Sequence, residues 1–150
     1  MIRTACLTAA IDLAAEIEAL EALGGGGVAT FSGVVRGDAG DRGPLVALEL
    51  EAWPAMAERA LGDIAAQATA RWPLLGLVLL HRHGRLPVGE RIVFIGTAAR
   101  HRAAALDACA FLIDWAKTKA PFWKREWFAD GSTRWVEARG ADDAAAARWV

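Results

Sequence analysis

Two pairs of short strand-like segments, each pair separated by a turn, most constrain how this chain can fold. In each pair the run of β-forming residues stops at a turn, around residues 87–89 in the first and around Asp130-Gly131 in the second. Strands joined by so short a connection run antiparallel. The predicted strands span residues 77–83 and 91–97, and residues 122–128 and 134–138. Since helix-like segments separate the two pairs, the element order predicts an α+β fold and excludes a doubly wound parallel sheet.

The rest of the chain divides into helix-like and strand-like segments without a linker or an internal repeat. Helical patterns predict helices over residues 9–22, 54–71, 101–117 and 141–148, and β-forming residues predict strands over 28–36 and 45–51. The third helix is predicted to place Leu106, Cys109, Ile113 and Ala116 on its inner stripe. The strand over 45–51 alternates, with the apolar residues Val46, Leu48 and Leu50 on one face and Ala47, Glu49 and Glu51 on the other. We therefore expect a single domain over residues 1–150, with an antiparallel sheet and three to four helices.

Charge and hydropathy exclude several classes of function. The chain is 55% hydrophobic with a formal net charge of −1, which is incompatible with intrinsic disorder and argues against a general nucleic-acid or membrane-surface binder. It shows neither a signal peptide nor an apolar run long enough to span a membrane, and its two cysteines are too few for a disulfide framework. A cytoplasmic protein with reduced thiols is expected.

The basic residues are distributed unevenly, and this points to a site. All three lysines, Lys117, Lys119 and Lys124, fall within one short window, whereas the other basic positions are arginines. The predicted end of a helix at Lys117 and the following strand can bring Lys117 and Lys124 to one pocket. A lysine can act there as a nucleophile or a proton donor, which an arginine does less readily. The alternative is an ordinary basic patch at a helix C-terminus, favoured by the helix dipole.

Two further segments could bind an anion. Arg36 ends a predicted strand and enters the Gly-rich loop 37–44, where its planar guanidinium could hold a phosphate or carboxylate; a solvated strand-end arginine is the alternative. His101 and Arg102 open the third predicted helix, and helix N-termini favour anions, although a simple capping region is equally compatible. Because residues 101 and 117 would lie about 24 Å apart along one helix, a site that uses both ends must be composite, built across a homodimer.

Other reactive residue types form no convincing site. His81 and His83 lie on one side of a predicted strand, but no third metal ligand is evident nearby, so satisfied strand histidines are expected. Cys109 lies on the predicted core stripe and is expected to be inert. The run of glycines at residues 24–27 lacks the pattern of a phosphate-binding loop.

The motifs together resemble the catalytic (large) subunit family of molybdopterin synthase. The matching stretches are ATFSGVVR (29–36), LELEAWPAMAERAL (48–61), RWPL (71–74), GERIVFIG (89–96), HR (101–102), KTKAPFWKRE (117–126) and RWVEAR (134–139). The lysine-containing segment is the most specific of them. The resemblance covers residues 28–149 in order and implies an α/β hammerhead fold and a central homodimer.

The resemblance also implies a reaction and a set of site residues. Family members transfer two sulfur atoms from a small ubiquitin-like carrier, which ends in a Gly-Gly thiocarboxylate, to cyclic pyranopterin monophosphate, forming the dithiolene of molybdopterin. By position, Lys117 and Lys124 would be the catalytic lysines, with no cofactor and no metal. The implied substrate-binding residues are Val34, Val35, Arg36, His101, Arg102, Lys117, Lys124, Arg125 and Glu126.

Two alternatives to this enzyme remain open on the sequence alone. A non-catalytic scaffold of the same fold would bind the carrier and tolerate loss of both lysines. A nucleic-acid binder would use Phe122, Trp123 and the basic window for base stacking, although the net charge argues against it. Lys119 lies in the same window, but no role can be assigned to it from the sequence.

Overall fold

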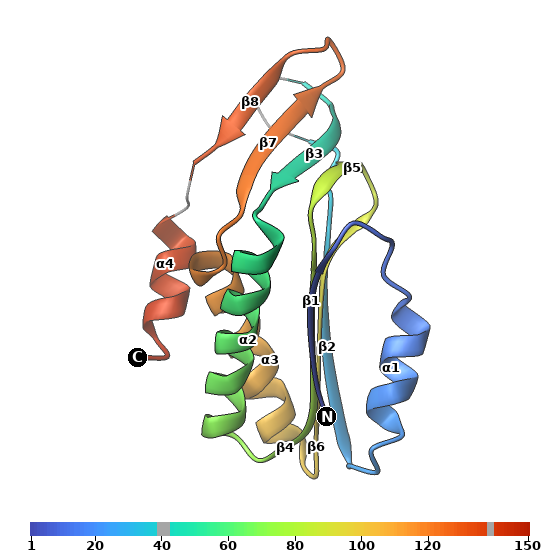
Figure 1. Cartoon of the computed structure of the whole chain (residues 1–150), viewed down its shortest axis with the longest axis vertical. Coiled ribbons are helices and arrows are strands. Elements are labelled where there is room, and N and C mark those ends of the chain that lie inside the picture. Colours follow the sequence, from blue (N-terminus) through green and yellow to red (C-terminus); the bar gives the residue numbers. More distant parts are fainter. Residues whose placement is uncertain (39–42, 138–139) are drawn as a thin grey trace.

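A computed structural model describes residues 1–38, 43–137 and 140–150 of the chain. Its helices and strands form two sheets with helices packed beside the larger one (Figure 1). In chain order the elements are β1 (Ile2–Leu7), α1 (Leu13–Glu21), β2 (Gly27–Val34), β3 (Leu45–Glu51), α2 (Pro54–Arg71), β4 (Leu74–Arg82), β5 (Gly84–Pro87), β6 (Arg91–Ala99), α3 (Arg102–Lys119), β7 (Trp123–Phe128), β8 (Thr133–Val136) and α4 (Gly140–Ala147). The expected α+β class is confirmed.

The sheet with the longer strands, called the larger sheet below, forms the buried centre of the molecule. Its strand order is β1-β4-β6-β2, and β4 and β6 are buried over seven successive residues each. Such continuous burial requires cover on both faces. Leu20 of α1 packs with Phe94 on one face, while residues of α2 and α3, among them Leu61 and Phe111, pack with Leu79 on the other.

The smaller sheet, in the order β5-β3-β7-β8, extends beyond the helices at one end of the larger one (Figure 1). All its pairs are antiparallel. The chain leaves the larger sheet at Gly84, whose positive φ of 99° suits a residue without Cβ, and β5 then pairs with β3. The chain enters β7 of this sheet directly after α3, and the three lysines lie at this junction between helix and sheet.

The structure corrects four expectations about elements and faces. The N-terminal strand β1 was not predicted, and it pairs with β4 in parallel rather than antiparallel. The short strand β5 lies between the strands predicted as a simple hairpin. Val46 is exposed and Ala47 buried, because a β-bulge shifts the register of β3 between Leu45 and Ala47.

The fourth correction concerns the third helix. Leu106 is exposed at 58%, whereas Ala105 and Ala108 are buried, because the N-terminal half of α3 presents a face of small residues to the sheet. The prediction of Cys109 and Ala116 as core residues is confirmed.

The predicted helix over residues 54–71 is confirmed with those bounds. The expected end of the last strand at Ala138 lies outside the described residues, as does the centre of the 37–44 loop. Among the described residues, no helix is both long and apolar enough to cross a lipid bilayer.

Candidate active site

Lys117 and Lys124 come from two different elements that meet at a tight turn. Lys117 lies in the last turn of α3 and Lys124 is the second residue of β7, where it pairs with Leu50 of β3. The helix ends before Pro121, because the proline ring cannot continue a helical backbone. The Phe122 amide then donates to the Ala120 carbonyl at 3.0 Å. The sequence therefore ends the helix and starts the strand within a few residues, which turns both lysines toward the same side.

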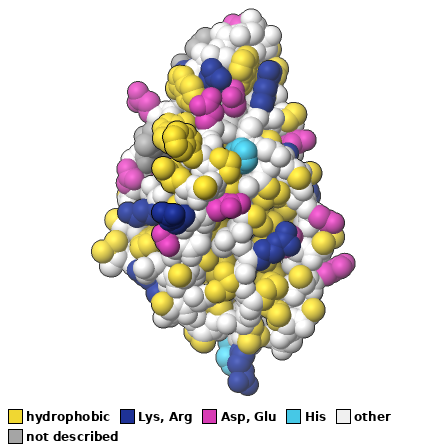
Figure 2. Space-filling model, in the orientation of Figure 1, with side chains coloured by type: hydrophobic (Ala, Val, Ile, Leu, Met, Phe, Trp, Pro, Cys, Tyr) yellow, Lys and Arg dark blue, Asp and Glu magenta, His cyan; other side chains and the backbone are white. Residues whose placement is uncertain are grey.

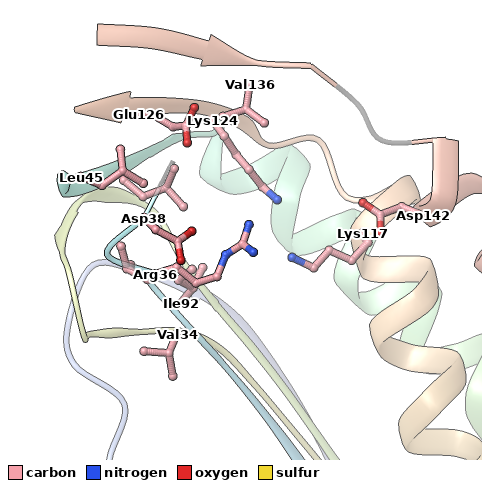
Figure 3. A pocket seen from close by; sticks show the side chains of 12 residues that line it. Val34, Arg36, Asp38, Leu45, Ile92, Lys117, Lys124, Glu126, Val136 and Asp142 are labelled. Atoms are coloured by element: carbon pink, nitrogen blue, oxygen red, sulfur yellow. The ribbon is translucent and has the colours of Figure 1, made fainter. Parts of the chain in front are cut away.

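The two lysines share a cavity of about 230 Å³ with Arg36. Figure 3 shows the guanidinium of Arg36 and the ammonium groups of Lys117 and Lys124 directed toward one another from three segments of the chain. A second cavity, of about 310 Å³, adjoins on the other side of both lysines and is lined by Trp123 as well. Converging cations in a cavity of this size create a positive potential suited to a small anionic substrate.

Acidic side chains border the same cavity and limit its net charge. Glu126 of β7 lines it and accepts a hydrogen bond from Arg134 Nε of β8 at 3.1 Å, so its carboxylate is already paired. Asp38 and Asp142 also line the cavity, the latter from α4 (Figure 3). The remaining lining is apolar: Val34, Val35, Leu45, Leu48, Ile92 and Val136.

Arg125 does not reach this cavity. Its side chain lies on the opposite face of β7, where its Nη2 donates to Glu49 Oε1 at 3.0 Å and its guanidinium carbon lies 4.9 Å from the ring centroid of Trp135. Glu49 also accepts from Trp127 Nε1 at 2.9 Å. This hydrogen bond, helped by the charge of Arg125, lowers the pKa of Glu49 although burial acts in the opposite direction.

His101 and Arg102 lie at the other end of α3. The 18 residues of this helix correspond to a length of about 27 Å, so these two side chains do not line the cavity of their own subunit. Figure 2 shows a histidine beside basic side chains at the tip of the molecule where β6 meets α3. The expectation that the two groups lie too far apart for one small pocket within a chain is confirmed.

The glycine run positions this second basic group, a role that the sequence did not reveal. A Cβ at Gly25 would lie 2.4 Å from the Ala99 carbonyl oxygen, and one at Gly26 would lie 2.6 Å from that of Arg100. The Gly26 amide donates to the Arg100 carbonyl at 3.2 Å. The backbone of the run is therefore packed against the start of α3, which only glycine permits at such distances.

His81 is close enough to Lys117 and Lys124 to interact with their charges, and it is not placed to ligate a metal. It is 6% exposed, and its ring stacks on Phe122 with centroids 3.8 Å apart. Burial, together with the nearby charges of Lys117 and Lys124, lowers its pKa to about 4. In the described part of the chain, no group of three or more His, Cys, Asp or Glu side chains is arranged to hold a metal ion.

The two thiols belong to the core. Cys6 and Cys109 are free and buried, and burial raises the pKa of each to about 11. Both therefore remain protonated near neutral pH, whereas only the deprotonated thiolate is an effective nucleophile. The expectation that Cys109 is unreactive agrees with this environment.

Several lining residues escaped sequence reasoning. Leu48 carried a signal, since it lies on the predicted apolar face of its strand, but Ile92 and Val136 look like ordinary strand residues. Asp142 lies close to Lys117 only because α4 packs back against α3, where Arg148 forms an ion pair with Asp114 at 2.8 Å. No local pattern reveals that return.

Comparison with known proteins decides the family. The MoaE protein family model matches residues 7–119, which is more than two thirds of the chain. The chain belongs to the MoaE family. Among curated members, the molybdopterin synthase catalytic subunit of Pseudomonas aeruginosa is 54% identical over 143 residues and covers 94% of both chains.

Solved MoaE structures agree with the fold. The molybdopterin biosynthesis MoaE protein from Burkholderia ambifaria superimposes with a TM-score of 0.81 at 45% identity, covering 99% of this chain and 98% of that one. A complex of subunits 1 and 2 of the molybdopterin-converting factor from Helicobacter pylori gives a TM-score of 0.73, covering 92% and 91% of the two chains. At 20% identity, this second match establishes the shared MoaE fold alone.

Proposed function

We propose that this chain is the catalytic subunit of molybdopterin synthase and acts as a sulfurtransferase in molybdenum cofactor biosynthesis. The substrate would be cyclic pyranopterin monophosphate, and the sulfur would come from the C-terminal thiocarboxylate of a small ubiquitin-like carrier. The observation that carries this proposal is the convergence of Arg36, Lys117 and Lys124 in one cavity. Both reactants are anionic, and this is the cluster that could receive them.

The two lysines would have different tasks. Lys117 is exposed at the mouth formed by the end of α3, where an extended carrier tail could place its thiocarboxylate beside the ammonium group. Lys124, half-buried on β7, would act as the acid and base toward the pterin. Ammonium groups close to the reacting atoms stabilise the negative charge that develops during sulfur transfer. Because the sulfur arrives on the carrier, the buried, protonated thiols of this chain need take no part.

The substrate phosphate would be held by a composite site. Arg36 would contribute from the same chain, and His101 and Arg102 would contribute from a second copy, because they lie at the far end of α3 within one chain. Val34, Val35 and Glu126 would complete the pocket wall. We assign no substrate contact in this cavity to Arg125, since its guanidinium is engaged by Glu49 on the other face of β7.

A partner protein is part of this proposal. The Helicobacter pylori match is a complex of two molybdopterin-converting factor subunits. We infer that the present chain assembles likewise with a small carrier subunit, giving a heterotetramer around a central homodimer. The cytoplasm, where thiols stay reduced, is the proposed location.

The decisive test is to incubate the chain with a thiocarboxylated carrier and cyclic pyranopterin monophosphate and to measure dithiolene formation. Lys117→Ala and Lys124→Ala should each reduce the rate by about 100-fold or more. Lys119→Ala is the matched control: its ammonium lies 5.8 Å from the Trp115 ring centroid and faces a different cavity. Wild-type rates in both lysine variants would show that the lysines are not catalytic, and no dithiolene from the wild-type chain with a competent carrier would support the non-catalytic scaffold.

A mixed-dimer experiment tests the composite site. Subunits carrying Lys117→Ala and subunits carrying Arg102→Ala should each be inactive alone, whereas a dimer of one of each would contain one intact site. Random exchange should therefore restore roughly a quarter of the wild-type activity, as two-fold symmetry requires. If mixing restores no activity although mixed dimers form, both groups do not serve one shared site.

A further inference from the structure

We propose that His81 is a positioning residue that holds Lys117 and Lys124 on the same cavity by stacking on Phe122. Describing the two lysines as the catalytic pair rests on the proposed function. The positioning itself is a statement about geometry and is testable without it. His81 lies on β4 of the larger sheet, so this contact joins the buried centre of the fold to the turn that carries the site.

The stack lies in the short segment that connects the two lysines. Phe122 lies five residues after Lys117 and two before Lys124, in the turn between α3 and β7. Its ring lies nearly parallel to the His81 imidazole, with an interplanar angle of 16° and centroids 3.8 Å apart. Phe122 also packs against the buried cluster formed by Val35, Leu50 and Leu86. A displaced Phe122 would therefore shift the end of α3 relative to β7, and with it the separation of the two ammonium groups.

The imidazole is well suited to be the fixed member of this stack. His81 Nδ1 lies 2.9 Å from the Arg82 carbonyl oxygen, and because a carbonyl only accepts, Nδ1 carries the proton in this contact. Arg82 is itself anchored, since its Nη2 donates to the Thr8 carbonyl and its Nη1 to Glu90. The ring plane is thus tied to the backbone of the central sheet, which a hydrocarbon side chain could not achieve by a hydrogen bond.

The ring is also neutral where a charge would disturb the site. Burial is the main cause that lowers the His81 pKa to about 4, and the positive charges of Lys117, Lys124 and His83 act in the same direction. At neutral pH the imidazole therefore adds no repulsion toward the nearby lysines. It offers Phe122 a flat, uncharged ring to stack on.

A cross-linking experiment measures the geometry directly. A short bifunctional amine reagent is applied to the full chain, and the linked peptides are assigned by mass spectrometry; with only three lysines in the chain, a Lys117–Lys124 link is unambiguous. His81→Leu, which removes the ring but keeps similar bulk, should lower the yield of this link several-fold. Modification of Lys119 should not change and serves as the internal control. His81→Phe keeps a flat ring for the stack but loses the hydrogen bond to the Arg82 carbonyl, so it should restore the link in part.

A double-mutant cycle tests whether His81 acts through Phe122. Phe122→Leu should reproduce the loss of the link, and adding His81→Leu to it should cause little further loss, because both variants break the same stack. In the assay for dithiolene formation, His81→Leu should lower kcat by about 10-fold or more with little change in the KM for the carrier, as expected for misplaced reacting groups.

Three results would overturn the proposal: an unchanged link in folded His81→Leu, a link lost equally in His81→Phe, or additive losses in the double variant. If His81→Leu does not fold, the comparison of His81→Phe with Phe122→Leu decides, since the first should keep part of the link and the second should lose it. The proposed function fails separately, if the wild-type chain forms no dithiolene while these cross-linking results hold.

Discussion

The two sheets of this protein differ in how deeply they are buried and in the side chains that they carry. In the larger sheet, β4 and β6 are buried along nearly their whole length and helices cover both faces. In the smaller sheet, β7 is mostly half-buried, β3 mixes buried, half-buried and exposed residues, and β8 exposes Trp135 and Val136. The first sheet is buried and mostly apolar, although it includes His81, Arg82 and Thr97, whereas the second carries charged and aromatic side chains on both faces.

This difference separates stability from chemistry. One face of the smaller sheet holds the Arg125, Glu49 and Trp127 network, and the other presents Lys124 and Glu126 to the cavity. Partly exposed ion pairs of this kind stabilise a fold only weakly. We therefore expect core substitutions in the larger sheet to unfold the protein, and substitutions in the smaller sheet to change the site with modest effects on stability.

The largest effect is expected from Phe94→Ala. Phe94 of β6 is fully buried in a core cluster with Leu20, Val78 and Leu80, and truncating a buried Phe lowers the free energy of unfolding by about 3–5 kcal/mol. Trp135→Ala in β8, where the ring is 51% exposed, is the matched control and should cost about 1 kcal/mol or less. Urea denaturation of both variants measures the difference, and equal losses would remove the contrast between the sheets.

A pH-dependent effect of intermediate size is expected at His81. Its pKa is about 4 in the folded chain against 6.5 for an unperturbed histidine, so the unfolded chain binds a proton that the folded chain does not. Stability should therefore fall as the pH decreases from 6.5 to 4, by up to about 3 kcal/mol from this group. Thermal unfolding of His81→Phe over this range should lack that component. Parallel pH profiles for the variant and the wild type would contradict the prediction.

The smallest effect is expected from Glu49→Gln. The hydrogen bond from Trp127 and the charge of Arg125 lower the Glu49 pKa, so their contribution is present near neutral pH and is lost as the pH falls through that lowered value. Gln keeps an acceptor oxygen but loses the charge, and about 1 kcal/mol of unfolding free energy should be lost at pH 7. At pH values low enough to protonate Glu49 in the wild type, the difference should disappear. A constant difference at all pH values would show that packing, not charge, stabilises this network.

Sequence patterns predicted those elements whose hydrophobic period is unbroken. The helix at residues 54–71 and the antiparallel pairing of β7 with β8 follow from local spacing and turn residues, and both are confirmed. The patterns failed where pairing partners are distant in the chain. β1 is short and pairs with β4, more than 70 residues away, and β5 interrupts what looked like a single hairpin.

The site was predictable in part for the same reason. Lys117 and Lys124 are close in sequence across one turn, so the sequence could bring them together, and Arg36 was proposed from its place at a strand end. Arg125, which the resemblance implied as a substrate-binding residue, instead donates to Glu49 on the opposite face of β7. No sequence pattern indicated a role for His81, because its stacking on Phe122 depends on how the segment before β7 packs against β4.

The sequence by itself determined the class of fold, the separation of the two ends of α3 and the pairing of two lysines across a helix-to-strand turn. These depend on local periods, on proline and glycine, and on the fixed rise of a helix. Only the tertiary structure decided which side chains surround that pair. Asp142, Ile92 and His81 reach the site through contacts between segments distant in the chain, and long-range packing of this kind leaves no local pattern from which it could be predicted.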